Sequence, residues 1–297
     1  VRVRPGAVLR NSWNGRPEAA GSSPARSILF KNNTKCVLCK PQFPKSKYEL
    51  SKVLKAHDLS LCGGWYSGTL LDTELEQEKD LIEGQLELFK ALNAPCLVYG
   101  ETAGTIQNVK SAPLNRRRNL NEQQFRSYGE KLTSFAEWCS EKGMEISFHY
   151  HMGTAVETEH DVDLLMKYTG EAVKLLYDAG HMAFAGGDAL GIIEKYGNRI
   201  SHVHAKDVRL QVINKLDRDK ESFLDAVLKG AFTVPGDGSL DFDEIIKRLA
   251  GIGYEGWFVV EAEQDPSFAP PYKYACIGYQ ALESALTRAG YTIDRMK

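Results

Sequence analysis

Two spacings of apolar residues alternate along the chain from about Pro44 onward. Segments with apolar residues every three or four positions predict amphipathic helices, and the short apolar runs between them predict strands. The predicted helices cover residues 45–58, 73–93, 122–143, 159–170, 188–197, 242–253 and 274–290. The predicted strands cover residues 59–68, 94–102, 145–151, 172–181, 199–207 and 256–265.

This alternation of strands and helices predicts a parallel sheet covered by helices. Such a sheet is either open and doubly wound or closed into a barrel. No G-x-G-x-x-G or Walker sequence follows a predicted strand, which disfavours a nucleotide-binding open sheet. The segments after the strands are long and rich in His, Asp and Glu. That is typical of the active-site end of a (β/α)₈ TIM barrel, so we expect this α/β fold.

The first 42 residues do not follow the pattern. The remaining chain holds six strand–helix units, whereas a closed barrel needs eight. We therefore expect an atypical, poorly ordered segment over residues 1–42. A barrel domain over residues 43–297 follows it and lacks its first strand, helix and strand. Residues 27–30 or 36–38 could replace one missing strand beside residues 59–68.

Composition narrows the class of protein. The 297 residues carry a net charge of -2, so no basic excess indicates a nucleic-acid partner. No apolar run approaches the ~20 residues that span a membrane. The six cysteines lie at scattered positions, which favours the reducing cytosol and a cytoplasmic protein. A homo-oligomer stays open at this stage.

Potential metal ligands gather at the ends of the predicted strands. Three strands end in a pair of such residues two positions apart, which places both on the same side of the strand. The pairs are His149 and His151, His202 and His204, and Glu261 and Glu263. Asp178 ends a further strand, with His181 in the following turn. Nitrogen and oxygen ligands without cysteine favour Mn²⁺, Co²⁺ or Zn²⁺.

Each residue alone has a plainer interpretation. A histidine in a predicted helix, such as His57 or His160, is typically structural. Asp178 alone could cap the following helix. Four strands that deliver ionisable groups to one rim are different, because without a cation repulsion and desolvation would destabilise the rim. The pattern therefore predicts a metal site. Which member of each pair binds the metal depends on depth along the strand.

Other residues are weaker candidates. Glu101 ends a strand and could serve the site or cap a helix. Trp65 and Tyr66 could line a polyol pocket or close the core. Lys206, two residues after His204, could transfer protons if its pKa were depressed beside a metal. Arg209 is a candidate substrate-binding residue in the same segment.

Several motifs together resemble the inosose dehydratases of the xylose-isomerase-like barrel superfamily. They are GWYSG, YHMGTAVET, DAGHMAFAGGD, HVHAKDVR, SFLDAVLKGAFTVPGDGSLDF and GYEGWFVVEAEQDP, and the resemblance runs from about Phe43 to the C-terminus. It implies a (β/α)₈ barrel with Mn²⁺ or Co²⁺, with Zn²⁺ as a further candidate metal and glutathione as a candidate cofactor. It also implies a polyol ketone substrate, scyllo-inosose (2-keto-myo-inositol), from which a hydro-lyase removes water in inositol catabolism.

The resemblance also implies roles for individual residues. Members of the superfamily commonly hold their metal with Glu, Asp, His and Glu from successive strands. At the matching positions this chain has His149, Asp178, His204 and Glu261. The expected catalytic residues are His151 or Lys206 as base, His181 as acid or hydroxyl-binding group, and Glu101. The expected substrate-binding residues are Trp65, Tyr66, His202, Arg209 and Glu263.

The chemistry follows from metal binding to the ketone, which stabilises an enolate after a base removes the adjacent proton. The β-hydroxyl then leaves as water with help from a general acid. Two alternatives stay open. A sugar isomerase or epimerase would use the same enolate without loss of water. A truncated, non-catalytic remnant would show no metal-dependent turnover.

Overall fold

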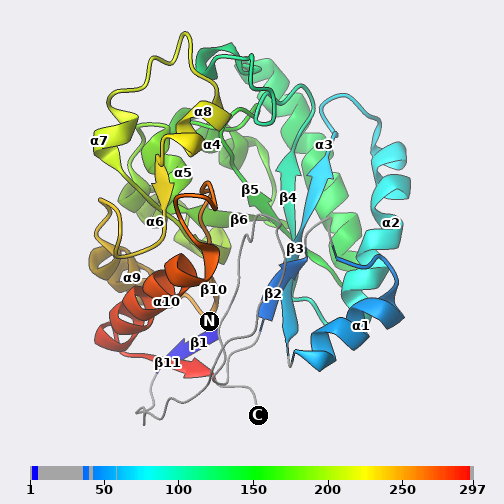
Figure 1. Cartoon of the computed structure of the whole chain (residues 1–297). Coiled ribbons are helices and arrows are strands. Elements are labelled where there is room, and N and C mark those ends of the chain that lie inside the picture. Colours follow the sequence, from blue (N-terminus) through cyan, green and yellow to red (C-terminus); the bar gives the residue numbers. More distant parts are fainter. Residues whose placement is uncertain (1, 6–35, 40–42, 58, 295–297) are drawn as a thin grey trace.

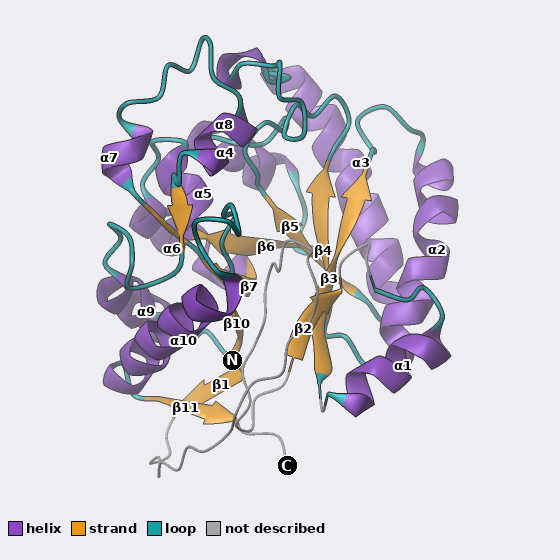
Figure 2. Ribbon diagram, in the orientation of Figure 1, coloured by secondary structure: helices purple, strands orange, loops and turns teal. Residues whose placement is uncertain are grey.

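The computed structural model of the chain, shown in Figure 1, describes residues 2–5, 36–39, 43–57 and 59–294. Six parallel strands form the centre of the fold and neighbour one another in chain order. They are β3 (Ser60–Gly68), β4 (Cys96–Glu101), β5 (Glu145–His149), β6 (Val173–Asp178), β7 (Ile200–Ala205) and β10 (Gly256–Val260). Figure 2 shows that the sheet curls and that helices cover its outer side.

Helices lie between successive parallel strands and after β10. They are α1 (Lys47–Ala56), α2 (Leu75–Ala91), α3 (Glu122–Glu141), α4 (Glu159–Tyr168), α5 (Ala179–Phe184), α6 (Ala189–Tyr196), α9 (Phe242–Gly251) and α10 (Pro271–Arg288). The spacing of apolar residues predicted all of them except α5, which begins within the strand predicted over residues 172–181. In the part of the chain that the structure describes, short 3₁₀ helices cover Leu114–Arg116 and Gly197–Arg199. Helices α3 and α4 begin at capping boxes, in which Asn121 and Thr158 accept from the backbone of Gln124 and Asp161. No helix of the described residues is both long and apolar enough to cross a membrane.

Three further strands extend the sheet at its edges. Strand β2 (Cys36–Cys39) pairs in parallel with β3, as expected for residues 36–38. Strand β1 (Arg2–Pro5) pairs antiparallel with β10, and β11 (Tyr291–Asp294) pairs antiparallel with β1. Neither β1 nor β11 was predicted. The rest of residues 1–42, and with it the prediction of poor order there, lies outside the described residues.

Along most of each strand, successive side chains point to opposite faces of the curled sheet. The concave face holds the buried side chains of Cys62, Cys96, Val98, Leu176, Trp257 and Val259. The convex face packs on the helices through Leu97, Tyr99, Ile146, Phe148, Leu175, Tyr177, Val203 and Phe258. Only every second side chain of a strand can therefore reach the centre of the curl.

Residues 206–241 form an additional layer over the carboxyl ends of the strands. The layer contains β8 (Asp207–Val208), α7 (Leu210–Ile213), α8 (Phe223–Leu228) and β9 (Phe232–Thr233), and β8 pairs antiparallel with β9. Phe223 and Phe232 of this layer pack on Phe184 of α5. The layer shields the strand ends from solvent.

Candidate metal centre

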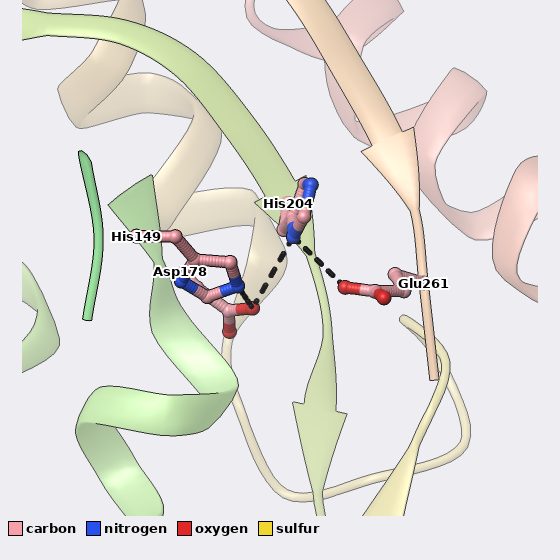
Figure 3. A group of neighbouring side chains, drawn as sticks. All are labelled: His149, Asp178, His204 and Glu261. Atoms are coloured by element: carbon pink, nitrogen blue, oxygen red, sulfur yellow. Dashed lines mark ion pairs between the residues drawn. The ribbon is translucent and has the colours of Figure 1, made fainter. Parts of the chain in front are cut away.

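Four residues from neighbouring strands come together at the carboxyl ends of the sheet. His149, Asp178 and His204 lie in β5, β6 and β7, and Glu261 directly follows β10. Each offers a ligand atom, and these atoms all lie within 4.8 Å of one another. Figure 3 shows the group, which we call the first set. All four side chains are buried.

Distances within the first set suit convergence on one ion. His204 Nδ1 lies 2.8 Å from Glu261 Oε2 and 3.7 Å from Asp178 Oδ2. His149 Nε2 lies 3.8 Å from Asp178 Oδ2. Two atoms that each lie ~2.1 Å from a tetrahedral ion are ~3.4 Å apart. The separations observed here scatter around that value.

Asp178 caps a helix with one carboxylate oxygen and offers the other oxygen to the first set. Its Oδ1 accepts from the backbone N–H of His181 at 3.0 Å and caps α5. The phenol of Tyr150 donates to the carbonyl of Asp178 and accepts from its N–H, both at 2.8 Å, which fixes this backbone. The other carboxylate oxygen, Oδ2, is buried and accepts no hydrogen bond among the described residues. A buried carboxylate oxygen that accepts no hydrogen bond is suited to bind a cation.

The electrostatics of the two histidines differ. Burial lowers the pKa of His149 far below its usual value, and neighbouring His204 lowers it further. Burial alone would also lower the pKa of His204, but Glu261 and Asp178 raise it overall. The carboxylates thus attract positive charge to this point. Two imidazoles and two carboxylates form a donor set that fits Mn²⁺, Co²⁺ or Zn²⁺.

A second group of ionisable residues lies beside the first set. His151, His181 and Glu263 also offer ligand atoms within 4.8 Å of one another, and Lys206 lies among them. We call these four residues the second set. His151 Nε2 is 3.2 Å from Glu263 Oε1, and Lys206 Nζ is 3.1 Å from Glu263 Oε2. Strands β5, β7 and β10 end earlier than predicted. Three members of the second set therefore lie just beyond the ends of their strands, namely His151, Lys206 and Glu263. The fourth member, His181, lies in α5.

The carboxylates around Lys206 shift the pKa of its amine, and a depressed pKa beside a bound metal stays a prediction. Its side chain is fully buried, and burial by itself lowers the pKa. The carboxylates of Asp178, Glu261 and Glu263 more than offset that effect, so the pKa lies above its usual value. These carboxylates favour the ammonium form of Lys206.

Trp65 reaches the site, but Tyr66 and Glu101 do not. The Trp65 ring contacts His149 and His151 edge-on, with centroids 5.9 Å and 6.0 Å away. Tyr66 points to the convex face, because adjacent strand residues alternate, and donates to Glu78 at 2.8 Å. Glu101 also faces the helices, where its carboxylate accepts from Ala103 N at 2.9 Å and from the phenol of Tyr99 at 3.1 Å.

His202 and Arg209 are likewise outside both sets. His202 lies one step deeper than His204, with Nδ1 3.6 Å from Cys96 Sγ. That difference in depth decides which member of the pair joins the first set. Arg209 donates to the carbonyl of Gly230 at 2.8 Å and to Thr233 Oγ1 at 3.1 Å. Its guanidinium thus connects parts of the additional layer.

Phe223 and Phe232 contact the second set, although neither was predicted. The Phe223 ring centroid lies 5.4 Å from that of His151, and the Phe232 centroid lies 5.4 Å from that of His181. Lys206 Nζ lies 5.6 Å from the Phe232 ring centroid. The sequence offers no local signal for these contacts, since both residues come from the short elements of the additional layer.

Known proteins share both the sequence and the fold. The family model for the xylose isomerase-like TIM barrel matches residues 28–276. The rhizopine catabolism protein MocC of Rhizobium meliloti is 42% identical over 253 residues, which cover 85% of this chain and 78% of that protein. An inosose dehydratase of Geobacillus thermodenitrificans is 40% identical over 236 residues, which cover 79% of each chain.

Solved structures with lower identity have the same fold. A D-tagatose 3-epimerase-like protein superposes with a TM-score of 0.60 at 17% identity, over 88% of this chain and 90% of that one. The IOLI protein, whose crystal structure holds a zinc atom, gives a TM-score of 0.55 at 16% identity, over 81% of this chain and 84% of that one. The prediction of a TIM-barrel fold is confirmed, and the chain belongs to the xylose isomerase-like TIM barrel family.

Proposed function

We propose that the chain is a metal-dependent hydro-lyase that removes water from scyllo-inosose in inositol catabolism. The observation that carries this proposal is the direct contact between two sets of residues, one suited to hold a cation and one suited to move protons. Several relatives about 40% identical to the chain are named inosose dehydratases, which supports the choice of substrate.

The first set would hold the metal. His149, Asp178, His204 and Glu261 would supply two nitrogen and two oxygen ligands, and Mn²⁺ or Co²⁺ are the ions we propose. A divalent cation there would polarise a ketone oxygen and make the adjacent C–H acidic. The protein's contribution is to bury the site and to fix the positions of these ligands.

His151 is the proposed base. Its Nδ1 lies 2.9 Å from the carbonyl of Met152, and a proton on Nδ1 satisfies that acceptor and leaves a lone pair on Nε2. A proton that arrives at Nε2 gains Glu263 Oε1, 3.2 Å away, as its acceptor. The resulting imidazolium is therefore stabilised where it forms. Lys206, already an ammonium, is the weaker candidate for this role.

His181 is the proposed hydroxyl-binding group. Its Nε2 lies 2.7 Å from Lys206 Nζ, so it accepts from the ammonium and its own proton lies on Nδ1. That Nδ1 is buried and makes no hydrogen bond among the described residues. It is available to donate to the leaving hydroxyl of a polyol.

An assay with scyllo-inosose tests the proposal. The protein is stripped with a chelator and resupplied with Mn²⁺, Co²⁺ or Zn²⁺, with and without glutathione. We expect metal-dependent formation of a dione that absorbs in the ultraviolet. Equal turnover by the chelated protein would contradict the role of the metal. Metal-dependent consumption of substrate without the chromophore would instead indicate an isomerase or epimerase.

A further inference from the structure

The ammonium group of Lys206 has the surroundings of a bound cation. Its Nζ lies 2.7 Å from His181 Nε2 and 3.1 Å from Glu263 Oε2. It also lies 3.4 Å from Asp178 Oδ2 and 3.4 Å from Glu261 Oε2. These four atoms come from the ends of two strands, β6 and β10, and from α5. No part of the side chain is exposed to solvent.

The acceptors include ligand types that would suit a second divalent ion. His151, His181 and Glu263 could hold one by themselves, since their ligand atoms lie within 4.8 Å of one another. An ion in that group would lie ~2.1 Å from His181 Nε2 and Glu263 Oε2. Both atoms already accept from Lys206 Nζ. The ammonium and a second ion therefore exclude each other.

The charges balance for one divalent ion and one ammonium. The two sets contain three carboxylates, Asp178, Glu261 and Glu263, which together carry three negative charges. One divalent ion in the first set and the charge of Lys206 neutralise all three. Burial makes any residual charge costly, so this balance favours a single metal ion.

The fold holds the Lys206 side chain in this place. Gly180 in α5 leaves space for its stem, because a Cβ there would lie 2.7 Å from Lys206 Cγ and 2.8 Å from the Lys206 carbonyl oxygen. On another side, the Phe232 ring faces the ammonium. The position of the amine is thus set by packing as well as by charge.

We propose that Lys206 is a built-in substitute for a second divalent cation, and that removal of its amine creates a metal site formed by His151, His181 and Glu263. The inference rests on the metal site of the proposed function. It adds that the protein limits itself to one ion through the Lys206 side chain. The ligand of the latent site is a divalent cation such as Mn²⁺.

Metal stoichiometry after equilibrium dialysis against Mn²⁺ tests the inference. We expect about one ion per chain for the wild-type protein and about two for Lys206→Met, which keeps the length of the side chain but not its charge. Lys220→Met is the matched control, because that lysine side chain is 81% exposed, and it should bind as the wild type does. In Lys206→Met/Glu263→Gln the additional ion should be lost again.

A competition experiment separates charge from structural damage. In Lys206→Ala, added ethylammonium should displace the second Mn²⁺ but not the first, and the dipolar broadening of the Mn²⁺ EPR signal by a neighbouring ion should disappear with it.

Folded Lys206 variants that bind only one ion would overturn the inference and leave the proposed function intact, as would a wild-type protein that binds two. A wild-type protein that binds none would overturn the metal site as well. If both Lys206 variants failed to fold, a second ion in the wild-type protein would still contradict the inference.

Discussion

The carboxyl group of Glu101 makes stability depend on pH. Glu101 ends β4 on the convex face of the sheet and is 1% exposed. Burial raises the pKa of Glu101 to about 7, although Ala103 N and Tyr99 donate to its carboxylate. The folded protein therefore holds the proton of Glu101 up to a higher pH than the unfolded chain does. Stability is then greatest at low pH and declines as the pH rises through the interval between the two pKa values.

The size of this effect follows from the two pKa values. The folded-state pKa is about 7 and the ordinary value for a glutamate is 4.5. At 1.36 kcal/mol for each pH unit, ionising Glu101 costs about 3 kcal/mol more in the folded protein than in the unfolded chain. The free energy of unfolding should fall by that amount between about pH 4.5 and about pH 7.5, as far as this group contributes.

Replacement of Glu101 by glutamine removes this dependence. Urea unfolding, followed by tryptophan fluorescence in the presence of a chelator, gives the free energy of unfolding of the wild type and of Glu101→Gln at each pH. We expect the difference between them to shift by about 3 kcal/mol in favour of the variant as the pH rises across that interval. A hydrogen bond lost in the variant changes this difference in the free energy of unfolding by the same amount at every pH. Glu87→Gln, at an exposed position of α2, controls for the loss of a surface charge. A difference that stays constant with pH would refute the reasoning.

Three further substitutions test the site and the packing around it. Glu261→Gln should weaken metal binding more than ~100-fold without unfolding the protein, as measured by metal content and circular dichroism. His181→Ala should keep the metal but lower kcat ~100-fold or more, and an emptied site would show that His181 is a ligand. Gly100→Ala should lower the free energy of unfolding by ~1–3 kcal/mol, because the new Cβ would lie 2.1 Å from the Trp65 ring, and urea unfolding measures it. Gly84→Ala in α2 is its control and should raise stability by ~1 kcal/mol, since nothing lies within 4 Å of the new Cβ.

The fold could be predicted from the sequence because strands and helices alternate regularly. The first set could be predicted because its His, Asp and Glu residues lie at the ends of predicted strands. The side-chain period of two residues correctly placed His149 and His151 on the same side. The same rule implies that Trp65 and Tyr66 point to opposite faces, so only one of them could line the pocket. It could not place Glu101, because β4 is buried on both faces and shows no alternation of apolar and polar residues.

Other features depend on contacts between distant parts of the chain. Strands β8 and β9 each contain two residues, and they form through pairing with one another over more than twenty intervening positions. Strand β11 pairs with β1, which lies at the other end of the sequence. The choice of His204 over His202 depends on the depth to which β7 extends into the curl. No local pattern of apolar residues contains this information.

Three strand ends supply one residue to each of the two sets, two positions apart. His149 and His151 follow one another in this way, as do Glu261 and Glu263, and Lys206 follows His204. A single-residue substitution at the outer position of such a pair can therefore exchange an acid, a base or a cation while the inner ligand keeps its place. A lineage built on this scaffold could diversify its reactions by such exchanges without rebuilding the metal site. An enzyme engineer could use the same three positions as a small, combinatorial library.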